Sequence, residues 1–325
     1  MTSYLVTGGA GFIGSNMVDE LLRRGESVRV LDNLSTGRLE NLAGALDRID
    51  FCEADIRNLE QIQPCFKGVD FVLHLAALPS VPRSVADPVS ANKVNIEGTL
   101  NVLLASRDAK VKRVVFAASS AAYGDNPTLP RVESHEPLPM SPYALTKLAG
   151  EYYCQIFTRL YGLEAVALRY FNIFGPRQNP HSQYTGVLSK FIAAYIKGTT
   201  PTIFGDGEQS RDFTYVDNVV DATLRACTAP EAPGRVINVG VGGRFTLNQT
   251  IALLNEIFGK QVTPRYDPPR DGDVLHSQAN ISLARQVLGY EPKVPYEQGL
   301  RRTVEWYRGE LAAEAGLGTG PAPPA

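Results

Sequence analysis

The sequence predicts an α/β fold, a doubly wound parallel sheet joined to a smaller mixed α/β lobe. In the first half of the chain, continuous apolar runs alternate with longer segments of helical periodicity. That alternation is typical of a parallel sheet covered by helices on both faces. A glycine-rich turn separates the first apolar run from the first helical segment. After about residue 172 the pattern changes to short strands, helices and loops rich in proline and glycine.

The elements of the first half are predicted in alternating order. Apolar and β-branched runs predict strands at residues 4–7, 28–31, 51–54, 71–77, 113–118 and 164–170. Helical spacing predicts helices at residues 12–24, 89–106 and 143–161. Right-handed crossovers between successive strands then give a doubly wound sheet.

The change of pattern near residue 172 sets the predicted division of the chain. Residues 1–172 are expected to form the first domain, and residues 173–315 mainly the second lobe, with some segments returning to the first domain. Short strands are predicted in this second part at residues 202–204 and 236–239. Residues 316–325 contain glycine, proline and alanine with few apolar anchors, so a disordered tail is expected.

Composition excludes several classes of function. The 325 residues carry a formal net charge of −2, which gives no indication of a nucleic-acid or acidic-membrane partner. The four cysteines and four histidines lie without Cys-x-x-Cys or metal-ligand spacing, so neither a disulfide framework nor a metal site is expected. No signal peptide is visible, and no apolar run approaches the roughly 20 residues that span a bilayer. A cytoplasmic location is therefore expected.

The glycine-rich turn predicts a dinucleotide site. Gly8, Gly11 and Gly14 form a Gly-x-x-Gly-x-x-Gly pattern between a predicted strand and a predicted helix. Glycines allow a tight turn and close approach of a diphosphate to the helix N-terminus. The second strand ends at Asp32, where a carboxylate can accept hydrogen bonds from the adenosine ribose and would repel a 2′-phosphate. The pattern favours NAD over NADP; a turn that binds nothing is the alternative.

A tyrosine and a lysine four residues apart predict a base. Ser141 and Pro142 are typical of a helix start, which places Tyr143 and Lys147 on one helical face. A nearby ammonium group would lower the pKa of the tyrosine, and the resulting phenolate could take a proton from a sugar hydroxyl. An ordinary amphipathic helix is the alternative, because this spacing also arises by chance.

Two serines strengthen the catalytic interpretation. Ser119 and Ser120 follow the predicted strand at residues 113–118, and ligands of doubly wound sheets bind at the carboxyl ends of strands. A serine there could hold the reacting oxygen beside the tyrosine. Taken alone, the two serines could form a simple turn.

Together these motifs resemble the extended short-chain dehydrogenase/reductases, over nearly the whole chain to about residue 307. The resemblance also rests on Asp55-Ile56, Leu75-Ala76-Ala77, Tyr123-Gly124 and Arg169-Tyr170-Phe171-Asn172. Within that superfamily the sequence is most similar to the UDP-hexose 4-epimerases. Residues 78–84 (LPSVPRS) resemble the UDP-N-acetylglucosamine 4-epimerase branch in particular.

The resemblance implies a set of ligand contacts. The implied NAD contacts are Gly8, Gly11, Phe12, Ile13, Gly14, Asp32, Asn33, Asp55, Ile56, Leu75, Ala76, Ala77, Ser119, Tyr143, Lys147 and Tyr170, although packing is the expected role of the Phe12 and Ile13 side chains. The implied UDP-sugar contacts are Ser80, Ser119, Ser120, Tyr143, Asn172, Gly186, Val187, Thr202, Ile203, Phe204, Arg211, Arg270, Asp273 and Ser277. The catalytic serine of the family corresponds to Ser119, with Ser120 next to it, and Tyr143 and Lys147 take the remaining catalytic roles.

The resemblance further implies which reaction is catalysed. Related dehydratases usually carry an Asp-Glu pair after the catalytic threonine, and UDP-glucuronate decarboxylases carry a glutamate just before the Tyr-Gly pair. Here Ser119 is followed by Ser120-Ala121-Ala122, without a carboxylate. Transient oxidation at C4 to a 4-keto sugar, followed by return of hydride to the other face, is therefore the expected chemistry. Ser277 corresponds to a position where a small residue leaves room for an N-acetyl group. UDP-GlcNAc and UDP-GalNAc are thus expected substrates, together with UDP-Glc and UDP-Gal.

Three alternatives stay open at this point. The first is UDP-glucuronate 4-epimerase, in which Arg83 could meet the carboxylate, although no second basic residue can be placed there. The second is another NDP-sugar oxidoreductase with exchangeable cofactor, and the third is a non-catalytic NAD(H) sensor. The resemblance also implies a homodimer, in which helices near residues 89–106 and 143–161 pair with their counterparts as a four-helix bundle.

Overall fold

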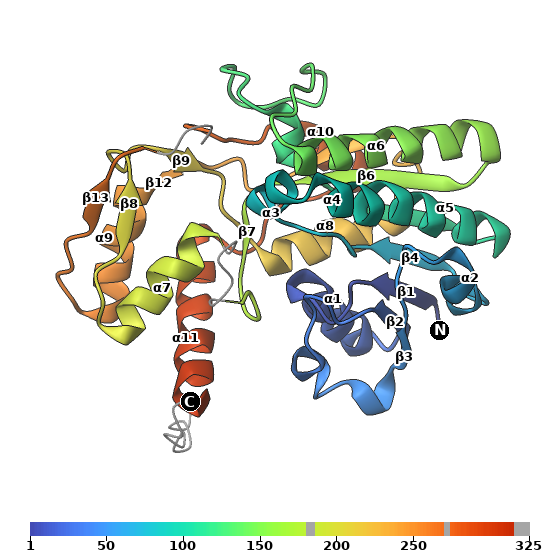
Figure 1. Ribbon diagram of the computed structural model, residues 1–325, viewed down its shortest axis with the longest axis horizontal. Coiled ribbons are helices and arrows are strands. Elements are labelled where there is room, and N and C mark those ends of the chain that lie inside the picture. The colour runs from blue at the N-terminus through green and yellow to red at the C-terminus, as the bar shows by residue number, and fades with distance from the viewer. Residues whose placement is uncertain (180–185, 270–273, 315–325) are drawn as a thin grey trace.

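The computed structural model describes residues 1–179, 186–269 and 274–314, with the backbone alone for residues 311–314. The predicted tail at residues 316–325 lies outside the described residues. Figure 1 shows two lobes, one built on a large sheet with its helices and a smaller one around α7 and α9.

Seven strands form one parallel sheet in the order β11-β6-β5-β4-β1-β2-β3. Their bounds are β1 Ser3–Thr7, β2 Ser27–Asp32, β3 Asp50–Glu53, β4 Phe71–His74, β5 Arg113–Ser119, β6 Glu164–Tyr170 and β11 Val236–Val239. The strand order reverses between β1 and β4, which places a topological switch point at their carboxyl ends. This order confirms the predicted doubly wound sheet.

Two strands differ from their predicted positions. The run predicted at residues 71–77 leaves the sheet after His74, because its last residues turn across the switch point. The strand at residues 236–239, which the sequence pattern grouped with the second lobe, pairs with β6 as an edge strand of the large sheet. The chain therefore crosses back from the second lobe into the first.

Helices cover both faces of the sheet, because strand residues point alternately to either side. On β5, Val115 and Ala117 join the core beneath α1 and α8, whereas Val114 and Phe116 join the core beneath α5 and α6. The helices of this lobe are α1 Phe12–Arg23, α2 Leu59–Ile62, α3 Val81–Ala86, α4 Pro88–Asn92, α5 Gly98–Asp108, α6 Pro142–Tyr161, α8 Val216–Thr228 and α10 Ser282–Leu288. The helix predicted at residues 89–106 is α4 and α5 joined through one π-helical turn, Lys93–Glu97.

The second lobe contains short strand pairs packed on three helices. Its elements are β7 Ile173–Phe174 paired with β10 Thr214–Tyr215, β8 Thr202–Phe204 with β13 Arg265–Asp267, β9 Ser210–Arg211 with β12 Phe245–Thr246, and the helices α7 Val187–Lys197, α9 Leu247–Phe258 and α11 Tyr296–Glu314. An aromatic cluster of Phe174, Phe213, Tyr215 and Tyr296 packs at its base. One continuous hydrophobic core runs from this cluster to the face of the sheet that α1 covers, and it joins the two lobes.

Two global properties follow from the side chains. All four cysteines are free thiols, and three of them are buried. No helix in the part of the chain that the structure describes is both long and apolar enough to cross a membrane.

Candidate active site

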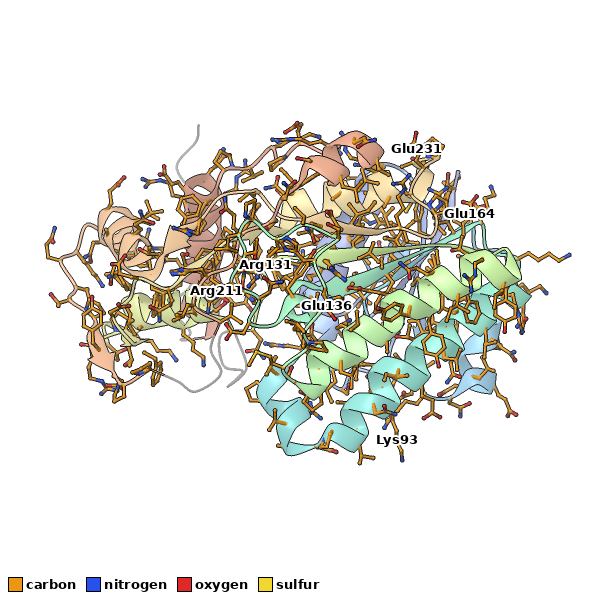
Figure 2. All side chains as sticks on the ribbon, turned by 90° about the horizontal axis from the view of Figure 1, so that it is seen from above. Lys93, Arg131, Glu136, Glu164, Arg211 and Glu231 are labelled. Carbon is orange, nitrogen blue, oxygen red and sulfur yellow. The ribbon has the colours of Figure 1, made fainter. Side chains whose placement is uncertain are left out.

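A cavity of about 1230 Å³ lies at the carboxyl ends of the sheet strands, where the lobes meet. Its lining comes from loops after β1, β2, β4 and β5, from α6, and from second-lobe residues such as Arg211 and Ser277. Figure 2 shows Arg131 and Arg211 in the middle of the molecule, between the helices of the sheet lobe and the second lobe. A cavity of this size exceeds what one small ligand requires.

The glycine loop, with Gly8, Gly11 and Gly14, lines this cavity at the switch point. Gly8 has a φ of +71°, and a Cβ there would lie 2.8 Å from the backbone nitrogen of Ala76. A Cβ at Gly14 would overlap the carbonyl oxygen of Gly8, so only glycine lets α1 begin this close to β1. The first turn of α1 has no side-chain cap, which leaves its backbone N–H groups free to bind an anion.

Polar groups behind this loop shape one end of the cavity. The Asp32 carboxylate accepts hydrogen bonds from Ala10 N (3.0 Å) and Leu34 N (2.9 Å), and its burial raises its pKa. Asn33 donates to Asp55 at 2.8 Å, and Arg57 lowers the pKa of Asp55 to about 2 through a side-chain hydrogen bond. Asp32 retains acceptor capacity on both oxygens, as a ribose diol requires.

Ser119 and Tyr143 meet on the other side of the glycine loop. Ser119 is the last residue of β5, opposite Tyr170 in the register of β5 and β6. Tyr143 is the second residue of α6, whose start is fixed because Ser141 caps the helix by accepting from Ala144 N at 3.2 Å. Burial raises the pKa of Tyr143, and a hydrogen bond with Ser119 lowers it.

Lys147 lies one turn further along α6 and is 4% exposed. Its Nζ donates to the carbonyl oxygen of Ala117 at 2.8 Å and lies 4.9 Å from the centre of the Phe116 ring. Burial lowers the pKa of Lys147 to about 8. The expectation that Lys147 lowers the pKa of Tyr143 is not met in this structure, where burial dominates and Ser119 provides the opposing effect.

A buried ion pair, which sequence patterns did not predict, lies behind Lys147. Glu151 follows Lys147 by one helical turn and accepts two hydrogen bonds from Arg169 of β6, at 2.8 and 2.7 Å. Both side chains are at most 3% exposed, and the guanidinium group stacks on the Tyr123 ring at 4.5 Å. Burial raises the pKa of Glu151, and Arg169 opposes that effect. This pair fixes α6 to the sheet beside the catalytic residues.

A second cavity of about 260 Å³ opens from the first into the small lobe. Asn172, Gly186 and Arg211 line both cavities, so the two are continuous. Thr202, Phe204 and Val187 line only the smaller one. Ile203 lines neither cavity, because strand alternation turns its side chain into the core, where it is fully buried. Any contact of Ile203 with a ligand would therefore come from its backbone, along β8.

The structure brings most of the predicted site residues to the large cavity. Those that line it are Gly8, Gly11, Phe12, Ile13, Gly14, Asp32, Asn33, Asp55, Ile56, Leu75, Ala76, Ala77, Ser80, Ser119, Ser120, Tyr143, Lys147, Tyr170, Asn172, Gly186, Arg211 and Ser277. Arg270 and Asp273 lie outside the described residues.

Sequence reasoning missed further residues of the same lining, among them Arg131, Arg177 and Trp306. Arg177 has a φ of +69°, and one of its buried nitrogens has no hydrogen-bond partner. No local spacing marks these residues, because each reaches the cavity from a loop or helix far away in the chain. Across the described ranges, no group of three potential metal-ligating side chains occurs.

This arrangement suits hydride transfer from a sugar hydroxyl carbon. The glycine loop and Asp32 could hold a dinucleotide, and the Ser119–Tyr143 pair lies where a substrate hydroxyl could enter beside it. The smaller cavity could take a planar ring, and Arg211 lies where the two cavities join.

Comparison with known families gives one match that covers most of the chain. A model of the NAD dependent epimerase/dehydratase family matches residues 4–240.

Curated relatives match over nearly their full length. The UDP-glucose 4-epimerase of Mycolicibacterium smegmatis is 41% identical over 309 residues, which cover 94% of this chain and 98% of that protein. The UDP-glucuronate 4-epimerase of Thermodesulfobacterium geofontis is 35% identical over 322 residues, covering 94% of this chain and 96% of that protein.

Solved structures have the same fold. The UDP-glucose 4-epimerase of Thermotoga maritima with UDP-glucose is 43% identical, with a TM-score of 0.91 over 95% of this chain and 100% of that one. The UDP-N-acetylglucosamine 4-epimerase of Methanobrevibacter ruminantium in complex with UDP-N-acetylmuramic acid is 40% identical, with a TM-score of 0.91 and coverage of 95% and 99%. A UDP-glucuronic acid 4-epimerase variant from Bacillus cereus with a fluorinated UDP-glucuronic acid and NAD is 31% identical, with a TM-score of 0.88 and coverage of 95% and 100%.

Proposed function

Since the chain belongs to the NAD dependent epimerase/dehydratase family, we propose that it is a UDP-sugar 4-epimerase that acts on UDP-hexoses and accepts their N-acetylated forms. One observation carries the proposal: Ser119 and Tyr143 meet beside the glycine loop, and no carboxylate side chain follows Ser119 in the lining. The carboxylates among the described lining residues are Asp32, Asp55 and Glu310, which come from other segments. Elimination or decarboxylation would need an acid or base beside the serine.

The cofactor is NAD, and the lining fits it. Gly8 and Gly14 leave the space that a diphosphate needs at the start of α1, and the Asp32 carboxylate disfavours a 2′-phosphate on the adenosine ribose. When bound, NAD supplies reversible hydride exchange with C4 of the sugar. Asp32, Asn33 and Asp55 would hold its adenosine half, and Lys147 and Tyr170 would contact its other half.

Side chains of the protein remove and return the proton at the C4 oxygen. Tyr143 is the base that removes the hydroxyl proton and the acid that returns it, while Ser119 holds the same oxygen by a hydrogen bond. Lys147 contributes a charged donor that is already oriented, because Ala117 fixes its ammonium group. Lys147 is buried and Ser119 and Tyr143 are half-buried, and partial exclusion of water lowers the local dielectric constant and strengthens these interactions.

The small lobe keeps the nucleotide anchored while the sugar presents each face in turn. The smaller cavity, between Thr202 and Phe204 on β8 and Val187 on α7, is the proposed uracil site. Arg211 lies where the two cavities join and is proposed to bind the diphosphate, for which guanidinium groups provide paired donors. Asn172, Gly186, Ser80 and Ser120 line the path between these anchors and Tyr143.

Incubation of the purified protein with UDP-GlcNAc and, separately, with UDP-Glc tests this function. We expect the C4 epimer of each sugar to appear by NMR without net consumption of NAD, because the hydride that is removed is also returned. Absence of an epimer from every UDP-hexose, even with NAD supplied, would contradict the proposal and favour a non-catalytic NAD(H)-binding protein.

Ser277 provides the argument for N-acetylated sugars. It lines the cavity as a small side chain, and its backbone nitrogen donates to Ser210 O at 3.0 Å, which fixes its position. We expect Ser277→Tyr to lower kcat/KM for UDP-GlcNAc by at least about tenfold more than for UDP-Glc, because the larger ring would fill the acetamido space. Parallel kinetics on both sugars measure this, and an equal loss on both would refute the role of Ser277.

The homodimer is also a proposal, and an exposed apolar face supports it. Val89 of α4 and Leu145, Tyr152 and Ile156 of α6 are all more than a third exposed. The three α6 residues lie on one side of the helix, which packs beside α3 and α4. A contiguous apolar face of this kind marks a protein interface.

Sedimentation tests the dimer. The measured mass should be twice the 35.3 kDa of one chain, and Tyr152→Glu should lower it towards the mass of the monomer. A monomer mass at every protein concentration would contradict the dimer.

A further inference from the structure

The backbone of Tyr143, the proposed base, is held in place by a second helix. Tyr143 is the second residue of α6, and the first N–H groups of a helix have no carbonyl partner within it. Its N–H instead donates to Oγ of Ser84 on α3 at 3.0 Å, across 59 positions of the chain. The two helices are in contact, and Figure 1 shows α3 beside the start of α6. The position of Tyr143 therefore depends on a side chain outside its own helix.

Ser84 is fully buried, and its hydroxyl group has a fixed direction. Its Oγ donates to the carbonyl oxygen of Val81 at 2.7 Å, in the preceding turn of α3. A serine hydroxyl has one proton, and with that proton directed to Val81 its oxygen accepts from Tyr143 N. The backbone nitrogen of Ser84 also donates to Ser80 O at 3.0 Å, at the capped start of α3. Ser84 thus presents an oriented acceptor to α6.

The carbonyl group of Tyr143 is tied to the same part of the chain. It accepts from Oγ1 of Thr146 at 2.8 Å, and that oxygen accepts in turn from Nδ2 of Asn95 at 3.0 Å. Oδ1 of Asn95 accepts from the backbone nitrogen of Leu78 at 2.7 Å. Thr146, Asn95 and Leu78 are all buried. Both polar groups of the Tyr143 backbone are therefore connected to residues 78–84.

Residues 78–84 form part of the wall of the large cavity. Leu78, Ser80 and Arg83 line it, on the proposed path of the sugar. The hydrogen bond from Tyr143 to Ser84 joins the base to this wall. A movement of α3 relative to α6 would therefore shift the phenol relative to the bound sugar.

We infer that Ser84 is a positioning residue for epimerisation, which fixes Tyr143 to the cavity wall at residues 78–84 and so keeps its hydroxyl group beside Ser119. The inference rests on the proposed function, because it concerns the base of that reaction. Proton transfer requires hydrogen-bond reach between base and hydroxyl, and a misplacement of about 1 Å can lower a rate about 100-fold. Ser84 acts through Tyr143, because Ser84 itself lies outside the cavity lining.

Ser84→Ala removes the acceptor of the Tyr143 N–H group and changes little else in volume. We expect kcat for UDP-glucose to fall about 10- to 100-fold while KM changes less than about threefold, because the nucleotide anchors in the small lobe are untouched. The NAD content should equal that of the wild type. Initial rates by NMR and NAD content by absorbance, on the full-length protein containing NAD, measure these quantities.

A double variant shows whether Ser84 acts through Tyr143. Without the Tyr143 hydroxyl group there is no base left to position, so Ser84→Ala should lower the residual rate of Tyr143→Phe less than about twofold. A loss as large in the Tyr143→Phe background as in the wild type would show that Ser84 acts independently of the base, and would overturn the inference.

Ser106→Ala is the matched control. Ser106 of α5 is also fully buried, and its Oγ donates to Val102 O at 2.7 Å within its own helix. Like Ser84, it lies outside the cavity lining. Ser106→Ala should leave kcat and KM unchanged, although it should lower the melting temperature about as much as Ser84→Ala does.

The remaining outcomes separate the inference from the proposed function. Epimerisation by the wild type with a normal kcat in Ser84→Ala, or a loss confined to KM or to NAD content, would overturn the inference and leave the proposed function intact. If the wild type epimerises no UDP-sugar, the proposed function fails, and hydrogen–deuterium exchange at the Tyr143 amide then tests Ser84 alone. Faster exchange in Ser84→Ala than in Ser106→Ala would support the positioning of Tyr143, whereas equal rates would overturn it.

Discussion

Tyr143→Phe is expected to reduce epimerisation by about 10²- to 10⁴-fold, the range for loss of a general acid–base group. The hydroxyl group of Tyr143 faces Ser119 in the cavity. The other two tyrosines of the described lining have their hydroxyl groups bonded elsewhere, Tyr123 to Asn238 and Tyr170 to Thr223, each at 2.7 Å. Phenylalanine keeps the ring and therefore the packing of α6. Turnover by NMR and NAD content by absorbance measure the two effects separately.

Tyr161→Phe is the control for this change. Tyr161 is the last residue of the same helix, is 51% exposed and lies outside the cavity lining. The Tyr161→Phe variant also loses a tyrosine hydroxyl group but should retain full activity. Near-normal turnover of Tyr143→Phe would remove Tyr143 from the mechanism, whereas loss of NAD would show that the variant acts through cofactor binding.

Glu151→Gln is expected to lower the free energy of unfolding by about 3–5 kcal/mol, because it leaves the Arg169 guanidinium buried and unpaired. Arg169 is 3% exposed and already has one nitrogen, Nη1, without a hydrogen-bond partner. In the wild type the negative charge of Glu151, one turn from Lys147, raises the pKa of that lysine, and the variant removes this charge. Urea unfolding of wild type and variant, with NAD removed from both, measures the loss.

Glu291→Gln is the matched control, because it breaks an ion pair with the same two hydrogen bonds at the surface. Glu291 accepts from Arg285 at 2.8 and 3.1 Å, and both side chains are more than half exposed. Exposed pairs contribute about 0–1 kcal/mol, so this variant should unfold almost as the wild type does. Similar losses in the two variants would contradict the argument that burial makes the Glu151–Arg169 pair important.

The local motifs of the site could be predicted from sequence because each depends on neighbours in the chain. Gly8, Gly11 and Gly14 stand in one turn between a strand and a helix, and the structure gives the close backbone contacts that exclude a side chain there. Tyr143 and Lys147 share a face of one helix, and Ser119 ends one strand. The alternation of apolar strands with helices likewise predicted a doubly wound parallel sheet, since a crossover connection has one preferred hand, but it did not predict that β11 forms an edge of that sheet.

The electrostatics of the site could not be predicted in the same way. Sequence spacing indicated a lysine next to a tyrosine, but burial determines the pKa of both, and the Lys147 ammonium group is directed to Ala117 O. Alternation along β8 decided that Thr202 and Phe204 line the smaller cavity while Ile203 enters the core. Desolvation depends on every segment packed around a group, and most of those segments are distant in the chain.

The sequence by itself predicted the doubly wound sheet without its edge strand β11, the glycine-rich turn and the candidate Ser–Tyr–Lys set, because periodicity and short spacings control local structure. Only the tertiary structure decided which charges are paired. Arg169 meets Glu151 across the interface of α6 and β6, whereas Arg131 lines the large cavity and donates to the carbonyl oxygen of Thr128. Both arginines look alike in the sequence, and long-range packing alone places a carboxylate beside Arg169 and a cavity beside Arg131.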